Sequence, residues 1–253
     1  MSALSESLGM SLMGSSTIPA VLAARMAKGV ETGEKIVELV QKGVTTRDIL
    51  TEDAFENAVM LLLTMGGSTN GILHLQAIYH EAGLGELPLS VFDEFSRRIP
   101  QVASIYPASE FDMVDFYEGG GVPAVLKEIE EYLHKDTLTV SGLTMGEALS
   151  RFSYTNNRNM IKSAEEPFAP TGGVAILKGN IAPLGCVIKP AAVPKHMFRY
   201  SGRAQVFTTE EESYQAVLEG RVKPGTCMVL MYEGPKGGPG MPEMYKTMKY
   251  LEG

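Results

Sequence analysis

Glu243 lies at the end of a segment whose backbone path is fixed by glycine and proline. Residues 232–244 read Tyr-Glu-Gly-Pro-Lys-Gly-Gly-Pro-Gly-Met-Pro-Glu-Met, after an apolar strand-like run and before a helix-like run. Exposed amides ahead of a helix N-terminus suit an anion. A carboxylate on such an element can ligate Mg²⁺, with Lys236, Gly237 and Gly238 lining a pocket for a substrate carboxylate. Composition alone favours a simpler explanation, a helix-start charge stabilised by the helix dipole.

Ser68, Thr69 and Asn70 form a second candidate site, because they follow two glycines and precede an apolar helical pattern. Hydroxyl and amide side chains at a glycine-flanked helix start can face a substrate pocket. The same residues suit a plain N-cap, in which the Ser68 hydroxyl accepts an amide two or three residues further on. The pattern leaves both interpretations open.

Other patterns with chemical potential are weak. The two cysteines, Cys186 and Cys227, form no CxxC pair and are expected to be free, buried thiols. The run Gly119–Ala124 has the form GxGxxA, but no clean β-run precedes it, and Pro123 favours a simple helix entry. His74 and His80 are six positions apart and would face different sides of one helix.

The elements that would carry these residues fall into a helical first part and a strand-rich second part. Capping residues and apolar spacing predict helices over about 17–28, 32–42, 51–65, 68–82, 90–99, 123–133 and 144–150, with Gly29 ending the first of them. Capping boxes are predicted at Ser90–Asp93, Thr144–Glu147 and Thr209–Glu212. Short β-runs follow at 174–177, 186–189, 205–207 and 228–231. This order predicts an α/β fold with a boundary near Pro170.

Composition excludes several classes of protein. The chain has 253 residues and a net charge of −8 with no basic tract, which argues against nucleic acid and membrane-surface partners. The longest apolar stretch, Val59–Leu63, is far too short to span a bilayer. The N-terminus has neither the basic start nor the apolar run of a signal peptide, so a cytoplasmic location is expected.

The motifs together resemble the dihydroxy-acid dehydratase and 6-phosphogluconate dehydratase family. Glu-Gly-Pro-Lys-Gly-Gly-Pro-Gly-Met-Pro-Glu-Met over 233–244 is similar to the signature of that family, and Gly66–Asn70 with the following Leu-His-Leu is similar to its GGSTN helix start. Residues 170–177, 179–183 and 223–225 resemble the entry into its C-terminal domain. The resemblance covers essentially the whole chain.

The resemblance implies a lyase that removes water from a 2,3-dihydroxy acid or sugar acid to give a 2-keto acid, as in branched-chain amino-acid biosynthesis or sugar-acid metabolism. It implies that Glu243 ligates Mg²⁺, and that the intact enzyme holds an iron–sulfur cluster and forms homo-oligomers. By resemblance, residues 1–169 belong to an α/β sandwich domain and residues 170–253 begin a β-barrel-like domain.

The same resemblance places most of the active site outside this chain. The cluster cysteines, two aspartates and a modified lysine of the family precede the segment matching Met1, and its catalytic serine follows the position of Gly253. We therefore expect an internal fragment with little activity alone, and with uncovered apolar faces that limit solubility or drive oligomerisation. The alternative is a non-catalytic protein that binds a partner or complements a missing subunit.

Overall fold

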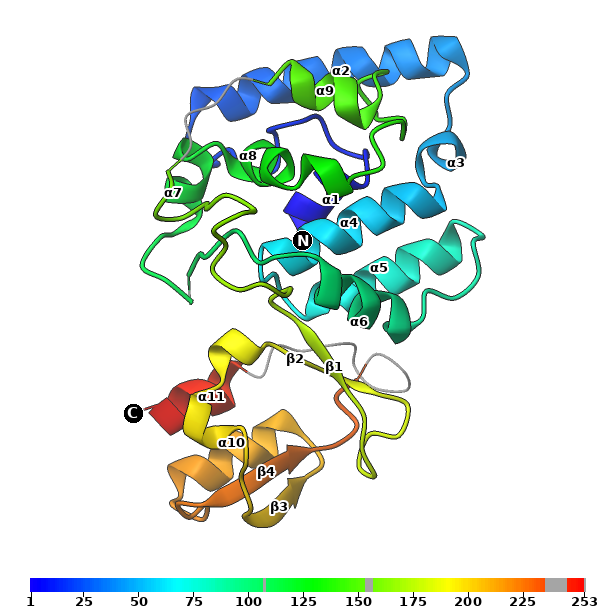
Figure 1. Ribbon diagram of the computed structural model, residues 1–253. Coiled ribbons are helices and arrows are strands. Elements are labelled where there is room, and N and C mark those ends of the chain that lie inside the picture. The colour runs from blue at the N-terminus through cyan, green and yellow to red at the C-terminus, as the bar shows by residue number, and fades with distance from the viewer. Residues whose placement is uncertain (107, 153–156, 235–244, 253) are drawn as a thin grey trace. The chain divides into compact units, whose positions relative to one another are not determined.

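A computed structural model describes residues 1–106, 108–152, 157–234 and 245–252. The chain forms two compact units, Met1–Val193 and Pro194–Gly253. The hydrophobic core lies in the first unit, and among the described residues of the second unit the buried apolar side chains are Phe207 and Ala216 (Figure 1).

The first unit is built around helix α4 (Glu52–Thr64). The Thr51 hydroxyl accepts a hydrogen bond from the Ala54 amide at 3.3 Å and begins the helix as predicted. Ten of the thirteen residues of α4 are buried, since its sequence is apolar on nearly every side. The helices that surround it are α1 (Ser2–Ser7), α5 (Asn70–Glu81), α6 (Leu89–Arg98) and α8 (Gly121–Glu128) (Figure 1).

Other elements of this unit connect or cover the core. They are α2 (Ala23–Lys42), α3 (Thr46–Ile49), α7 (Met113–Glu118), the 3₁₀ helix η1 (Glu130–Tyr132), α9 (Met145–Ser150) and a second 3₁₀ turn η2 (Pro190–Ala192). Strands β1 (Ala175–Leu177) and β2 (Cys186–Ile188) form an antiparallel hairpin whose first strand packs on α6. The predicted β-runs at 174–177 and 186–189 are therefore confirmed.

The second unit contains two parallel strands joined by a helical crossover connection. Strand β3 (Arg203–Phe207) pairs in parallel with β4 (Thr226–Leu230), and α10 (Glu210–Leu218) connects them and packs on both. The remaining elements are a 3₁₀ turn η3 (Lys195–Met197) and α11 (Tyr245–Glu252), which packs against α10. Helices with small sheets make the chain α/β, and the described residues form no closed barrel.

Several sequence predictions need correction. Gly29 does not end a helix, because α2 runs unbroken from Ala23 to Lys42 and ends at Gly43, where the backbone turns left-handed at φ +69°. The predicted box at Ser90–Asp93 is wrong, since Pro88 precedes the first turn of α6 and Asp93 instead pairs with Arg97 at 2.9 Å. The box at Thr144–Glu147 is confirmed. Both cysteines are free, but Cys186 is exposed and Cys227 is half-buried rather than buried.

The apolar side of α2 faces solvent. Leu39 is its one buried residue, whereas Met26, Val30, Val37 and Val40 are 79%, 65%, 55% and 71% exposed. Among the described helices, none combines the length and apolar character that crossing a membrane requires.

Candidate functional site

The glycine- and proline-rich segment predicted as a metal and substrate loop is flanked by the elements expected of it. Strand β4 ends at Leu230 and helix α11 begins at Tyr245. The predicted residues of this loop, Lys236, Gly237, Gly238 and Glu243, lie outside the described residues. At its entry, the Glu233 carboxylate accepts the Glu210 amide at 2.8 Å, so this glutamate serves the N-terminus of α10.

The Ser68–Asn70 triplet lies at the start of α5, as predicted. Ser68 and Thr69 are exposed, and the Ser68 hydroxyl accepts the Asn70 amide at 3.3 Å. The residue at the N-cap position is Thr69 rather than Ser68. The hydrogen bond to an amide two residues further on is the one that the capping interpretation predicted for Ser68. Both Ser68 and Thr69 are nevertheless exposed to solvent.

Two glycine pairs of the sequence, Gly66–Gly67 and Gly172–Gly173, meet next to this helix start. A Cβ placed on Gly173 would lie 2.4 Å from the Cα of Gly66, so the two backbones touch and neither position has room for a side chain. The Gly173 amide donates to the Leu63 carbonyl at 2.8 Å, and the Gly172 amide donates to the Ser96 carbonyl at 2.7 Å. Two motifs about a hundred positions apart are thereby fixed to the same end of α4.

The space beside Ser68 is small. A cavity of about 50 Å³ is lined by Met1, Ala3, Leu4, Leu62, Met65, Gly67, Ser68 and Gly71. A cavity of this size holds only a few water molecules, so the described residues beside Ser68 do not by themselves form a pocket for a sugar acid.

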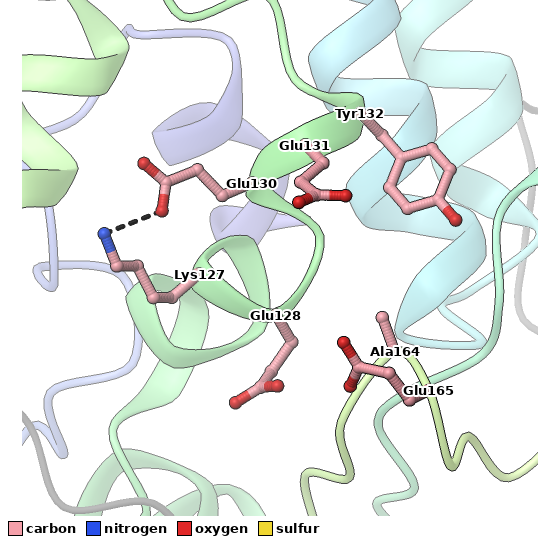
Figure 2. A pocket seen from close by; sticks show the side chains of 7 residues that line it. All are labelled: Lys127, Glu128, Glu130, Glu131, Tyr132, Ala164 and Glu165. Carbon is pink, nitrogen blue, oxygen red and sulfur yellow. Dashed lines mark ion pairs between the residues drawn. The ribbon is translucent and has the colours of Figure 1, made fainter.

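A larger pocket of about 450 Å³ lies beside α8 and η1, and Figure 2 shows its side chains. Its lining is Lys127, Glu128, Glu130, Glu131, Tyr132, Ala164 and Glu165. Lys127 is paired with Glu130 at 2.7 Å (Figure 2). The backbone amide of Glu165 and the hydroxyl of Ser163 hold the pKa of the Glu165 carboxyl below its usual value. An excess of carboxylates repels an anionic substrate, so this pocket does not suit a dihydroxy acid.

One group of described residues has the donor types of a metal site. Asp53 and Glu56 on α4 and His134 after η1 offer ligand atoms that all lie within 4.8 Å of one another. Sequence reasoning missed this group, because His134 is 78 positions from Glu56. The available signal was the pair of carboxylates three positions apart at the start of a helix.

Comparison with known proteins places the chain in a family. The family model described as dihydroxy-acid/6-phosphogluconate dehydratase N-terminal matches residues 1–148, and the C-terminal model of the same family matches residues 159–253. The chain belongs to this dehydratase family. Dihydroxy-acid dehydratases are among its relatives: that of Ignicoccus hospitalis is 46% identical over 96% of this chain. That of Caldanaerobacter subterraneus is 46% identical, and that of Methanosarcina barkeri 47%, each over 100% of this chain.

The chain spans less than half the length of these dehydratases. It covers 44% of the Ignicoccus protein and 46% of the other two. A protein-bound iron–sulfur cluster is held mainly by cysteine thiolates, usually four of them. Cys186 and Cys227, one in each compact unit, are the chain's two cysteines, so its own residues do not fit such a cluster.

Proposed function

We propose that this chain forms part of a hydro-lyase that converts a 2,3-dihydroxy acid into a 2-keto acid, in the manner of the dihydroxy-acid dehydratases of branched-chain amino-acid biosynthesis. The observation that carries the proposal is 44–47% identity, over 96–100% of the chain, to eight proteins of that name. The two family models match in the order N-terminal then C-terminal, which supports one continuous dehydratase segment.

In this proposal Glu243 is an oxygen ligand of Mg²⁺. Of the two glutamates in the loop, Glu233 already caps α10, which leaves Glu243 as the carboxylate for a hard cation. Bound Mg²⁺ would supply positive charge against the substrate carboxylate and neighbouring oxygen. Lys236, Gly237 and Gly238 line the pocket from the same loop, and Ser68, Thr69 and Asn70 line it from the start of α5.

The remaining parts of the proposal concern the whole enzyme. Residues 1–169 belong to its α/β sandwich domain and residues 170–253 to a β-barrel-like domain; the end of one family match at 148 and the start of the next at 159 support a division in this region. The iron–sulfur cluster is held by cysteines of the intact enzyme. That enzyme is a cytoplasmic homo-oligomer.

A chimeric enzyme tests the proposal. The matching segment of the Ignicoccus dehydratase is replaced by this chain, and 2-keto acid formation is measured with 2,3-dihydroxyisovalerate and with a sugar acid. We expect turnover of the first substrate by the chimera and none by the isolated chain. Preference for the sugar acid would support the hydro-lyase reaction but replace the proposed substrate with a sugar acid.

Glu243→Gln within the chimera tests the metal ligand. Mutation of residues that only support a metal ligand lowers metal affinity or activity by about 10–100-fold. Loss of the ligand itself should therefore lower kcat/KM by about 100-fold or more. Glu219→Gln is the matched control, because Glu219 is exposed and forms a surface ion pair with Arg221. Equal activity of the Glu243 variant and the control would refute the assignment.

The outward apolar side of α2 favours a second candidate, a subunit-complementing fragment. Such a fragment would restore 2-keto acid formation when mixed with polypeptides covering the rest of a dehydratase. Failure of mixing, together with an active covalent chimera, would leave only the first candidate.

A further inference from the structure

The first turns of α4 present two carboxylates on one side. Asp53 and Glu56 are three positions apart in α4, and residues at this spacing are neighbours on a helix surface. The two ring nitrogens of His134 each contact one of them, with Nε2 2.6 Å from Glu56 Oε2 and Nδ1 3.7 Å from Asp53 Oδ1. The three side chains therefore converge from two segments that are distant in sequence.

The position of His134 is fixed by a buried neighbour of the two carboxylates. Asn57, on the next position of α4, is fully buried and bonds the backbone of His134 twice. Its Nδ2 donates to the His134 carbonyl at 3.0 Å, and its Oδ1 accepts the His134 amide at 2.9 Å. Thr137 closes the loop, since its hydroxyl donates to the same carbonyl at 3.0 Å. A ligand on such a supported backbone loses little freedom when it binds an ion.

The charges around this group suit a cation. In the part of the chain that the structure describes, His134 is the only basic side chain within 4.0 Å of either carboxylate. Within this distance no lysine or arginine of the described residues pairs with the two carboxylates, so their negative charge favours a cation. All three side chains are partly exposed, so an ion can reach them from solvent.

We propose that Asp53, Glu56 and His134 form a binding site for a divalent transition-metal ion of the Zn²⁺ class. Imidazole nitrogen and carboxylate oxygen are both ligands of Zn²⁺, with bond lengths of about 2.0–2.2 Å. The ligand atoms, one from each residue, lie within 4.8 Å of one another. The contacts of 2.6 and 3.7 Å are made by different ring nitrogens, so binding one ion through a single nitrogen requires side-chain rotation that brings both carboxylates to the same side of the ring. Mg²⁺ prefers oxygen donors and octahedral geometry, so this site is distinct in kind from the proposed site at Glu243.

The ion would act as a clamp between α4 and the segment after η1. Three protein ligands leave a fourth position for water. Because an ion that binds only the folded state stabilises it, Zn²⁺ at a hundred times its Kd should raise the melting temperature by roughly 5–10 °C.

Zn²⁺ titration of the whole chain by calorimetry tests the site. The background carries Cys186→Ser and Cys227→Ser, which removes thiols that also bind zinc. We expect one equivalent of Zn²⁺ to bind, and a large excess of Mg²⁺ not to displace it. His134→Gln should weaken binding by at least tenfold, and Asp53→Asn with Glu56→Gln should weaken it similarly. His80→Gln, an exposed histidine on α5, is the matched control and should bind like the parent chain.

Co²⁺ gives a second readout that does not depend on folding energy. Its visible absorption changes when an imidazole enters the coordination sphere, so the band should be lost in His134→Gln and kept in His80→Gln. Circular dichroism of the metal-free variants checks that each is folded. The proposal is overturned if the parent chain binds no stoichiometric Zn²⁺, or if the His134 and His80 variants bind alike.

Discussion

Helices α4 and α2 both carry apolar residues at helical spacing, yet ten of the thirteen residues of α4 are buried, and only Leu39 is buried among the twenty of α2. In α4 the apolar residues continue around the helix, so neighbours can cover it from every side. In α2 the half-buried residues are Lys28, Glu31, Lys35 and Glu38, which form ion pairs on the side that carries Leu39. The opposite side is apolar and open to solvent. An amphipathic pattern thus predicts a helix and an interface without specifying which molecule covers the apolar side.

The same substitution in both helices measures this difference, and the larger effect is expected in α4. Val59 is fully buried in the core, and Val59→Ala removes two methyl groups and leaves a cavity. Each buried carbon contributes about 0.8 kcal/mol, and the cavity adds to this, so we expect a loss of about 2–3 kcal/mol. Urea denaturation followed by circular dichroism measures it. A loss below about 0.5 kcal/mol would mean that α4 is not the centre of the folded core.

A buried acid next to this core gives a pH-dependent effect. Glu6 is 1% exposed, and its carboxylate accepts the amides of Gly14 at 2.8 Å and Ser16 at 2.5 Å. Burial raises the pKa of Glu6 above 4.5, although the Ser16 and Gly14 hydrogen bonds oppose the shift. The folded state then binds the proton more tightly than the unfolded state. Glu6 therefore adds its whole contribution to the free energy of unfolding below pH 4.5. This contribution decreases as the pH rises through the pKa of the folded state.

Glu6→Gln removes this titration, so the difference between parent and variant carries the test. We expect the free energy of unfolding of the parent, minus that of the variant, to decrease between pH 4.5 and pH 7. Urea denaturation at several pH values measures the difference and cancels other carboxyls, such as Asp48 and Glu147, whose pKa values are lowered. An increase with pH would show that the two amide hydrogen bonds outweigh burial.

How far the sequence predicts this molecule depends on whether a signal is local. Thr51 and the Thr144–Glu147 box begin helices as predicted, because a cap is set by residues three positions apart. Gly29 misled the prediction, since an interior glycine costs only about 1 kcal/mol and α2 tolerates it. The contact of Gly66 with Gly173 rests on tertiary structure and had no local sign.

The site follows the same rule. The start of α5 at Ser68–Asn70 was predictable from its glycines and hydroxyls, to within one position of the cap. The group around His134 was not predictable, because Asn57 positions that histidine across 77 residues. Glu243 stays a prediction from motif and resemblance.

The smallest effect is expected from Val37→Ala, the counterpart of Val59→Ala on the exposed side of α2. Val37 is 55% exposed, so no cavity forms, and alanine is the better helix former by roughly 0.5 kcal/mol. The free energy of unfolding should therefore stay unchanged or rise by up to about 0.5 kcal/mol, opposite in sign to the α4 variant.

Exposed apolar stripes promote association, so Val30→Lys with Val37→Lys should shift the chain toward monomer in sedimentation velocity, with circular dichroism unchanged. A loss above 1 kcal/mol for Val37→Ala would mean that a second copy of the chain already covers this side of α2, because burial in an interface restores the cavity cost that exposure removes.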